Sequence, residues 1–231
     1  MYNLLLGIAC IFICFILEII VAKVFKKEGL FIWIAVASIL ANISVCKTVN
    51  ILGVVSSLGN ILFASNFLAT DIISELYGSK ESKKAVIMGL VSVVLYIVAT
   101  QLTLLFKPDI TDVAHNSMIG LFSISLRVSI ASVTMYFISN MLDVYLFEKI
   151  KEKLPGKMWV RSFVATIFSN CSENYLFAFA AFVGIYDINT ILSIATIGSI
   201  IEILIAMCGT PFLYIAKKQF KNPFKHKGVR N

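Results

Sequence analysis

Residues 4–22 read LLLGIACIFICFILEIIVA, nineteen residues with a single charged side chain, that of Glu18. An α-helix rises 1.5 Å per residue, so about 20 apolar residues cross the roughly 30 Å hydrocarbon core of a bilayer. The sequence therefore predicts an all-α integral membrane protein, a polytopic bundle of six to seven transmembrane helices in a single transmembrane domain. The later apolar runs lie near residues 30–49, 54–78, 85–106, 119–148, 159–183 and 190–216.

The composition excludes a water-soluble fold. Of the 231 residues, 59% are hydrophobic and only 14% are charged, and the mean hydropathy is +0.90. A soluble domain of this length cannot bury that much apolar surface. The five cysteines lie within the apolar runs, without a C-x-x-C pair or a histidine at ligand spacing. We therefore expect no metal site and no cofactor.

Basic residues predict the orientation in the membrane. Of the 20 Lys and Arg residues, 17 lie in loops 23–27, 80–84 and 149–161 and in the tail from Lys217 to Arg230. Cytoplasmic segments carry an excess of Lys and Arg. We therefore expect an external amino terminus and a basic cytoplasmic tail at residues 217–231. Because these charges lie in short connections between apolar runs, they indicate membrane topology and not nucleic-acid binding.

The junction between the second and third runs is ambiguous. Residues 47–53, KTVNILG, are barely polar. Irregular backbone at membrane depth is tolerated only where the protein buries it or where it lines a cavity. Residues 47–56 are therefore either a true loop or a broken helix.

A nine-residue segment is repeated. Residues 139–147, SNMLDVYLF, recur thirty positions later as residues 169–177, SNCSENYLF. The two copies lie on consecutive runs that cross the membrane in opposite directions. We therefore expect them to face each other in inverted sense, as in transporters built from repeats.

Charged side chains within the runs need a partner, a water-filled cavity or a function, because each costs at least about 2.5–3.5 kcal/mol at membrane depth. We interpret Glu18 as a structural residue that reaches toward Lys23 at the interface. Glu75 is close to Lys80 and Lys83 in the sequence, which predicts an interfacial ion pair.

Other charges lie too deep for that explanation. Asn170 and Glu173 share a helix face and fall near the bilayer midplane when depth is counted from the cytoplasmic end of their run. Counted from the outer ends of their runs, Arg127 and Glu202 fall in the same central layer, which predicts a shared polar site. A purely structural bridge between Arg127 and a carboxylate is the alternative.

Two adjacent polar stripes mark the third run. Asn66 and Thr70 are four residues apart, as are Asp71 and Glu75, so each pair shares a helix face. Such a helix must face the protein interior. Motifs of hydrolases, metalloproteases and nucleotide-binding loops are missing from the sequence. We therefore do not expect an enzyme.

Residues 67–78, FLATDIISELYG, closely resemble the signature of the queuosine precursor transporter family, also called the VUT family. The resemblance implies import of a 7-deazaguanine base, such as queuine or its aminomethyl or cyano precursors, for tRNA queuosine salvage. It also implies a fold akin to the substrate-binding subunits of energy-coupling-factor vitamin transporters. Further segments that follow in the family's order are Lys83-Lys84-Ala85, Arg127 with Ala131-Ser132, Leu142-Asp143-Val144, residues 157–161 (KMWVR) and residues 210–214 (TPFLY).

The family pattern and the polar faces together predict the substrate-binding residues. Four positions depart from the pattern: Asn140 replaces Gln, Glu173 replaces Asp, Glu202 replaces Lys and Gly209 replaces Asp. A lost cation and a gained anion at Glu202 favour a cationic base, such as the aminomethyl form or queuine, over the neutral cyano form. The predicted set is Asn66, Thr70, Asp71, Arg127, Asn140, Asp143, Asn170, Glu173 and Glu202.

Our leading interpretation is a stand-alone transporter in the cell (inner or plasma) membrane. The alternative is a substrate-binding membrane subunit for another small nucleobase-like or vitamin-like solute, which needs a separate ATP-driven partner. The sequence has no ATP-binding motif, which agrees with both interpretations. A homo-oligomer and an energising partner are left open.

Overall fold

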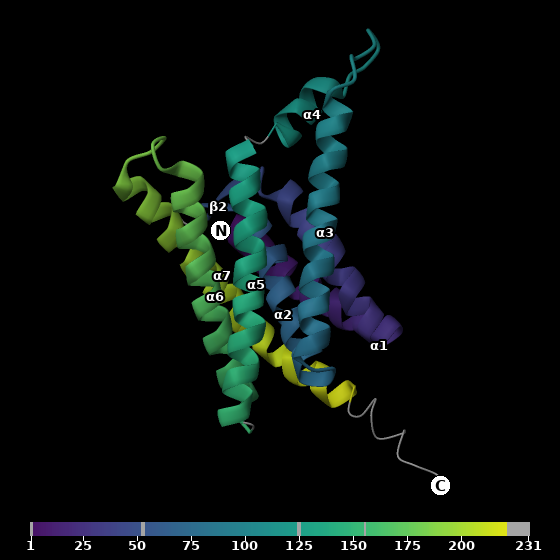
Figure 1. The fold of residues 1–231 in the computed structure, drawn as a ribbon, viewed down its shortest axis with the longest axis vertical. Helices are drawn as coiled ribbons and strands as arrows, with labels where there is room; N and C mark the ends of the chain where they lie inside the picture. Colours follow the sequence, from purple (N-terminus) through teal and green to yellow (C-terminus); the bar gives the residue numbers. More distant parts are fainter. Residues whose placement is uncertain (1, 52–53, 124–125, 155, 221–231) are drawn as a thin grey trace.

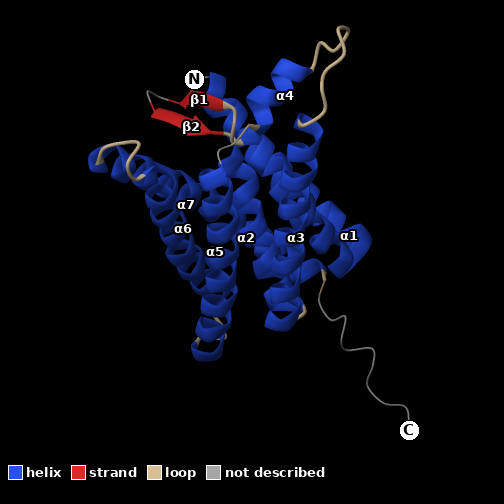
Figure 2. Cartoon of the chain, turned by 45° about the horizontal axis from the view of Figure 1, so that its top comes forward, coloured by secondary structure: helices blue, strands red, loops and turns tan. Residues whose placement is uncertain are grey.

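A computed structural model of the chain describes residues 2–51, 54–123, 126–154 and 156–220. The described residues form a bundle of helices with one small β-hairpin at one end (Figures 1 and 2). The prediction of an all-α membrane bundle is confirmed. The elements are α1 (Tyr2–Ser44), β1 (Thr48–Ile51), β2 (Val54–Ser57), α2 (Gly59–Leu76), α3 (Ser79–Leu104), α4 (His115–Phe122), α5 (Leu126–Lys153), α6 (Met158–Phe182) and α7 (Ile188–Gln219).

Helix α1 is bent sharply and supplies two segments of the bundle. Lys26 has non-helical dihedral angles, φ 53° and ψ −129°. The two halves run back along each other, since the Asn3 amide near the start of α1 donates to the carbonyl of Asn50, just beyond its end. At the bend, a Cβ on Gly29 would lie 2.5 Å from the Val21 carbonyl oxygen. Glycine is therefore needed there for the close approach of the two halves.

Long apolar helices make up most of the bundle. Within the described residues, four helices, α1, α3, α5 and α7, are long and apolar enough to cross a membrane by length and composition. With α1 counted as two segments and the eight-residue α4 left out, the described residues form seven long helical segments, in line with the predicted six to seven. Helices α2 and α6 both bury polar side chains, among them Asp71 on α2 and Asn170 on α6.

Helix α2 lies at the centre of the bundle. Residues 64–74 are buried without interruption, so this part of the helix has no lipid-facing side. Helices α1, α3, α5 and α7 all pack against it. The prediction that this polar helix faces the protein interior is therefore confirmed.

The basic connections gather at one end of the bundle, which we name the basic end. Lys27 at the α1 bend lies 3.0 Å from Glu81 at the start of α3. Lys151 near the end of α5 and Lys217 near the end of α7 both contact Glu75 near the end of α2. The four basic segments counted in the sequence thus meet on one side. The opposite side, which holds the β-hairpin and α4, is the hairpin end (Figure 1).

This arrangement makes a topology prediction. A reporter fused after Asn231 should be active in the cytoplasm, and one inserted in the connection before α4, within residues 107–113, should be active outside. The reason is that all four basic segments lie at the end opposite this connection. Paired fusions with an alkaline phosphatase and a fluorescent protein measure both positions. Activity of both insertions on the same side would contradict the assignment.

Two expected segment boundaries are wrong. The junction at residues 47–56 is neither an open loop nor a broken helix, since β1 and β2 pair antiparallel with Thr48 opposite Ser57 and Ile51 opposite Val54. Its run of β-branched Thr, Val and Ile residues favours a strand over a helix. The expected span at 119–148 is also divided, because α4 ends at Phe122 and α5 begins at Leu126.

Candidate functional site

A column of buried polar side chains runs through the bundle between the two ends. Seven of the nine predicted site residues are at most 7% exposed, and Glu173 is partly buried. The residues come from α2, α5, α6 and α7, which all carry polar side chains toward the same interior. We name as the polar column the side chains of Asn66, Thr70, Asp71, Asn140, Asp143, Asn170, Glu173 and Glu202.

The two copies of the sequence repeat face each other and exchange hydrogen bonds. Ser139 of the first copy donates to Glu173 of the second over 2.7 Å. Ser169 of the second copy donates to Asp143 of the first over 3.0 Å. In each copy the serine lies four residues before the acid, so each copy donates one of these hydrogen bonds and accepts the other. This confirms the prediction that the copies meet in inverted sense on α5 and α6.

Several side-chain amide atoms of the polar column have no hydrogen-bond partner among the described residues. Both amide atoms of Asn170 are unpaired, as are the side-chain oxygens of Asn66 and Asn140. These three residues are at most 2% exposed. An unmade hydrogen bond at a buried polar group costs about 1–3 kcal/mol. Buried amides left in this state are suited to receive a polar ligand or water.

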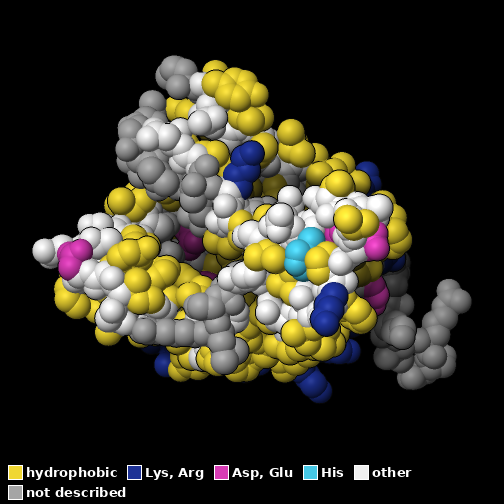
Figure 3. Space-filling model, turned by 90° about the horizontal axis from the view of Figure 1, so that it is seen from above, with side chains coloured by type: hydrophobic (Ala, Val, Ile, Leu, Met, Phe, Trp, Pro, Cys, Tyr) yellow, Lys and Arg dark blue, Asp and Glu magenta, His cyan; other side chains and the backbone are white. Residues whose placement is uncertain are grey.

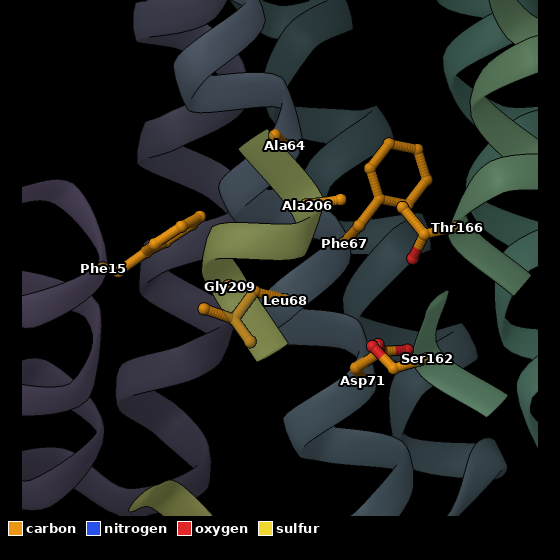
Figure 4. Close-up of a pocket in the computed structure, with 9 residues that line it drawn as sticks. All are labelled: Phe15, Ala64, Phe67, Leu68, Asp71, Ser162, Thr166, Ala206 and Gly209. Atoms are coloured by element: carbon orange, nitrogen blue, oxygen red, sulfur yellow. The ribbon is translucent and has the colours of Figure 1, made fainter. Parts of the chain in front are cut away.

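The part of the column nearest the basic end is centred on Asp71. Ser162 of α6 donates to its carboxylate, and the other carboxylate oxygen is unpaired within the described residues. Figure 4 shows the two side chains pointing toward each other beside a cavity. The cavity has a volume of about 10 Å³, which is close to the room that one water molecule needs.

The part nearest the hairpin end is acidic. Glu202 of α7 accepts a hydrogen bond of 2.8 Å from Asn174 of α6 and lies close enough to Glu173 for their charges to interact. From Ser162 to Glu173, α6 rises by roughly 16 Å, so the column extends over about half of a bilayer core. Seen from the hairpin end, the surface is hollowed and acidic side chains are visible in the recess (Figure 3).

Arg127 does not lie in a central layer with Glu173 and Glu202, as the depth count predicted. Helix α5 begins at Leu126, so Arg127 falls in its first turn at the hairpin end. The depth count was wrong because it started the helix at residue 119, inside α4. The side chain of Arg127 lies outside the described part of the structure.

A cluster of ion pairs at the basic end was not predicted. Arg161 is 1% exposed and pairs with Glu75, and its guanidinium lies 5.3 Å from the centre of the Phe147 ring. Lys151 and Lys217 lie 3.7 and 2.5 Å from the same carboxylate. The prediction that Glu75 pairs with Lys80 and Lys83 is therefore wrong. Its neighbours come from α5, α6 and α7, which local sequence spacing does not reveal.

The interpretation of Glu18 as an interfacial residue is also wrong. Its side chain is 0% exposed, and neither carboxylate oxygen has a hydrogen-bond partner in the described residues. Instead of reaching toward Lys23, it faces α2 and interacts electrostatically with Asp71. Local sequence gives no signal for this, because Lys23 follows only five residues later.

The chemistry of the column suits a small polar organic molecule. Its groups are carboxylates, amides and hydroxyls, which accept and donate hydrogen bonds at the edges of a heterocycle. Within the described residues, no three His, Cys, Asp or Glu side chains are grouped so that they hold a metal ion.

Comparisons with known proteins agree with this chemistry. Residues 57–216 match the family model Vut_1, described as "Putative vitamin uptake transporter". The chain is 33% identical over 224 residues to a Bacillus subtilis protein named "Probable queuosine precursor transporter", covering 96% of this chain and 98% of the relative. It is 24% identical over 144 residues to the "Queuosine precursor transporter" of Escherichia coli, covering 62% of each chain. No solved structure matches the chain.

Proposed function

Because this chain belongs to the vitamin uptake transporter family, we propose that it imports a queuosine precursor, a 7-deazaguanine base, across the cell membrane for tRNA modification. The observation that carries the proposal is the set of unpaired amide groups buried in the polar column. The names of two relatives supply the substrate class. We also propose that the basic end faces the cytoplasm.

A 7-deazaguanine fits the hydrogen-bonding groups of the column. Its ring N–H and exocyclic amine lie side by side, so one carboxylate accepts both, and its carbonyl accepts from an amide N–H. Asn170 offers an unpaired amide N–H and an unpaired carbonyl oxygen, and Asn140 offers a second unpaired oxygen. Glu173 accepts from Ser139, the residue before Asn140, and Asp143 accepts from Ser169, the residue before Asn170, which supports this assignment.

The conformation described is closed at the part of the column nearest the basic end. Small-molecule sites commonly have volumes of about 300–1,000 Å³, whereas the cavity beside Asp71 has about 10 Å³. The base therefore reaches Asp71 only when helices around this part of the column separate. A polar site that is closed in one conformation and exposed in another suits a transporter that alternates its access between the two sides.

Expression in cells that lack both queuosine synthesis and their own importer tests this function. The chain alone should restore queuosine to tRNA when a 7-deazaguanine is supplied, as measured by mass spectrometry of tRNA digests. Supplying queuine, the aminomethyl base and the cyano base separately identifies the substrate. If the chain is present in the membrane and tRNA still lacks queuosine with every base supplied, the proposal is contradicted.

Within this function, Glu202 should select for a cationic base. It is a buried carboxylate that accepts a hydrogen bond from Asn174, and no basic side chain pairs with it within the described residues. A hydrogen bond to a charged group contributes about 1.5–3 kcal/mol. Glu202→Gln should therefore reduce uptake of the aminomethyl base by about tenfold or more and leave uptake of the cyano base nearly unchanged.

Competition between the two bases for uptake measures this selectivity. Glu152→Gln, at an exposed position on α5, is the matched control and should leave the preference unaltered. An equal loss for both bases on Glu202→Gln would show that Glu202 does not discriminate by charge.

A further inference from the structure

The proposed binding of the base leaves one buried acid unused. Glu18 of α1 is 0% exposed, with both carboxylate oxygens unpaired among the described residues. It lies outside the polar column but close enough to Asp71 for their charges to interact. An acid in this place needs an explanation, because an ionised carboxylate without a cation or hydrogen bonds is among the costliest groups to bury.

The groups facing this pair are mostly acidic. Glu18 is faced by Cys14 one turn earlier on α1 and by Asp71 on α2. Helices α3 and α7 also pack against α1, but no basic side chain from them interacts with Glu18 within the described residues. Asp71 is faced by Asp143 on α5, by Glu75 on its own helix and by Arg161 on α6.

The nearby cation does not neutralise Glu18. The guanidinium of Arg161 is paired with Glu75, one helical turn beyond Asp71. Ionising both of two neighbouring carboxyl groups in such surroundings costs much free energy, because the two negative charges repel each other. Other buried carboxyl pairs share one proton for this reason. In the closed conformation a proton is therefore the simplest partner for Glu18 and Asp71.

Water has a place beside Asp71, one member of this pair. The cavity next to Asp71 is also lined by Phe15, Gly209 and Ser162 (Figure 4), and its volume of about 10 Å³ is close to the room needed for one water. Phe15 lies three residues before Glu18, on the same face of α1. When the helices separate to admit the base, water entering here reaches both carboxyl groups, and their ionised forms become less costly.

We propose that Glu18 and Asp71 share an exchangeable proton that is taken up from outside and released to the cytoplasm with each base imported, with Glu18 as the proton-carrying group. One proton enters the pair from external water and one leaves to cytoplasmic water in each cycle, so the pair returns to its starting charge. This inference rests on the proposed function and adds its source of energy. ATP and a second protein are not required.

The test uses the purified full chain in liposomes, with the membrane potential held at zero by potassium and valinomycin. A gradient of about one pH unit, alkaline inside, should concentrate labelled aminomethyl-7-deazaguanine about tenfold at one proton per base. Glu18→Gln keeps the size of the side chain and cannot ionise. It should abolish this accumulation and retain exchange of labelled for unlabelled base in the absence of a gradient.

Matched variants define the controls. Glu28→Gln, at an exposed position of α1 beyond the bend, should accumulate base as the wild type does. Glu18→Asp retains an ionisable group and should recover part of the accumulation. A pH-sensitive dye inside liposomes with wild-type protein should report acidification on addition of base, which tests proton movement without any substitution.

The outcomes separate this inference from the proposed function. Wild-type exchange without gradient-driven accumulation or acidification would overturn the inference and leave the transport function standing. Normal accumulation by Glu18→Gln, or loss of both activities in folded Glu18→Gln protein, would overturn the role of Glu18. Absence of any wild-type exchange would overturn the proposed function and the inference with it.

Discussion

Replacing Arg161 with methionine is expected to lower the free energy of unfolding by about 3 kcal/mol. Arg161 is 1% exposed and pairs with Glu75, and removal of one partner from a buried ion pair typically costs about 3–5 kcal/mol because the other charge stays buried. We expect the lower end, since Lys151 and Lys217 also contact Glu75. Their side chains are more exposed than that of Arg161, so they compensate only in part.

Unfolding by increasing denaturing detergent in mixed micelles measures this effect. Lys157→Met is the matched control, because Lys157 is an exposed lysine just before α6 and its loss should change stability by less than about 1 kcal/mol. The double replacement Arg161→Met with Glu75→Gln should recover part of the loss. Equal stability of Arg161→Met and the wild type would show that the buried pair does not hold the basic end together.

The second large effect is expected on transport. Replacing Glu173 with alanine should reduce uptake of the base by at least about tenfold, since a hydrogen bond to a charged group contributes about 1.5–3 kcal/mol. The substitution also removes the acceptor of the Ser139 hydroxyl, which joins the two repeat copies. Because the exchange between the copies is reciprocal, Asp143→Ala should have an effect of similar size.

Uptake of labelled base into whole cells, at equal abundance of each variant in the membrane, measures these losses. Glu152→Ala is the matched control, because it removes an exposed glutamate from the same pair of helices. If the Glu173→Ala variant transports at the wild-type rate, Glu173 does not belong to the binding site.

Much of the site could be predicted from the sequence because its residues contradict their apolar surroundings. Asn66, Asp71 and Asp143 are costly within membrane helices, so a protein interior was the expected place for them, and they are buried there. The repeat at residues 139–147 and 169–177 also predicted how α5 and α6 face each other. Local patterns and membrane energetics are sufficient for such statements.

Features that depend on contacts between distant segments could not be predicted in this way. Glu75 is near Lys80 in the sequence, but its partners come from helices that begin or end much later in the chain. Glu18 reads as interfacial because the bend at Lys26 that folds α1 back is not visible in an apolar pattern. The hairpin of β1 and β2 could not be predicted either, because an apolar run of β-branched residues suits both a strand and a membrane helix.

The most direct test of the account is calorimetric titration of the purified chain with aminomethyl-7-deazaguanine. The account predicts saturable binding of one base per chain, weakened by about tenfold or more in Asn170→Ala, because the amide of Asn170 is buried and has no hydrogen-bond partner in the described part of the chain. Asn189→Ala, at an exposed position of α7, should bind as the wild type does. No saturable binding of any 7-deazaguanine, or equal affinity of the wild type and Asn170→Ala, would contradict the central claim that the polar column binds the base.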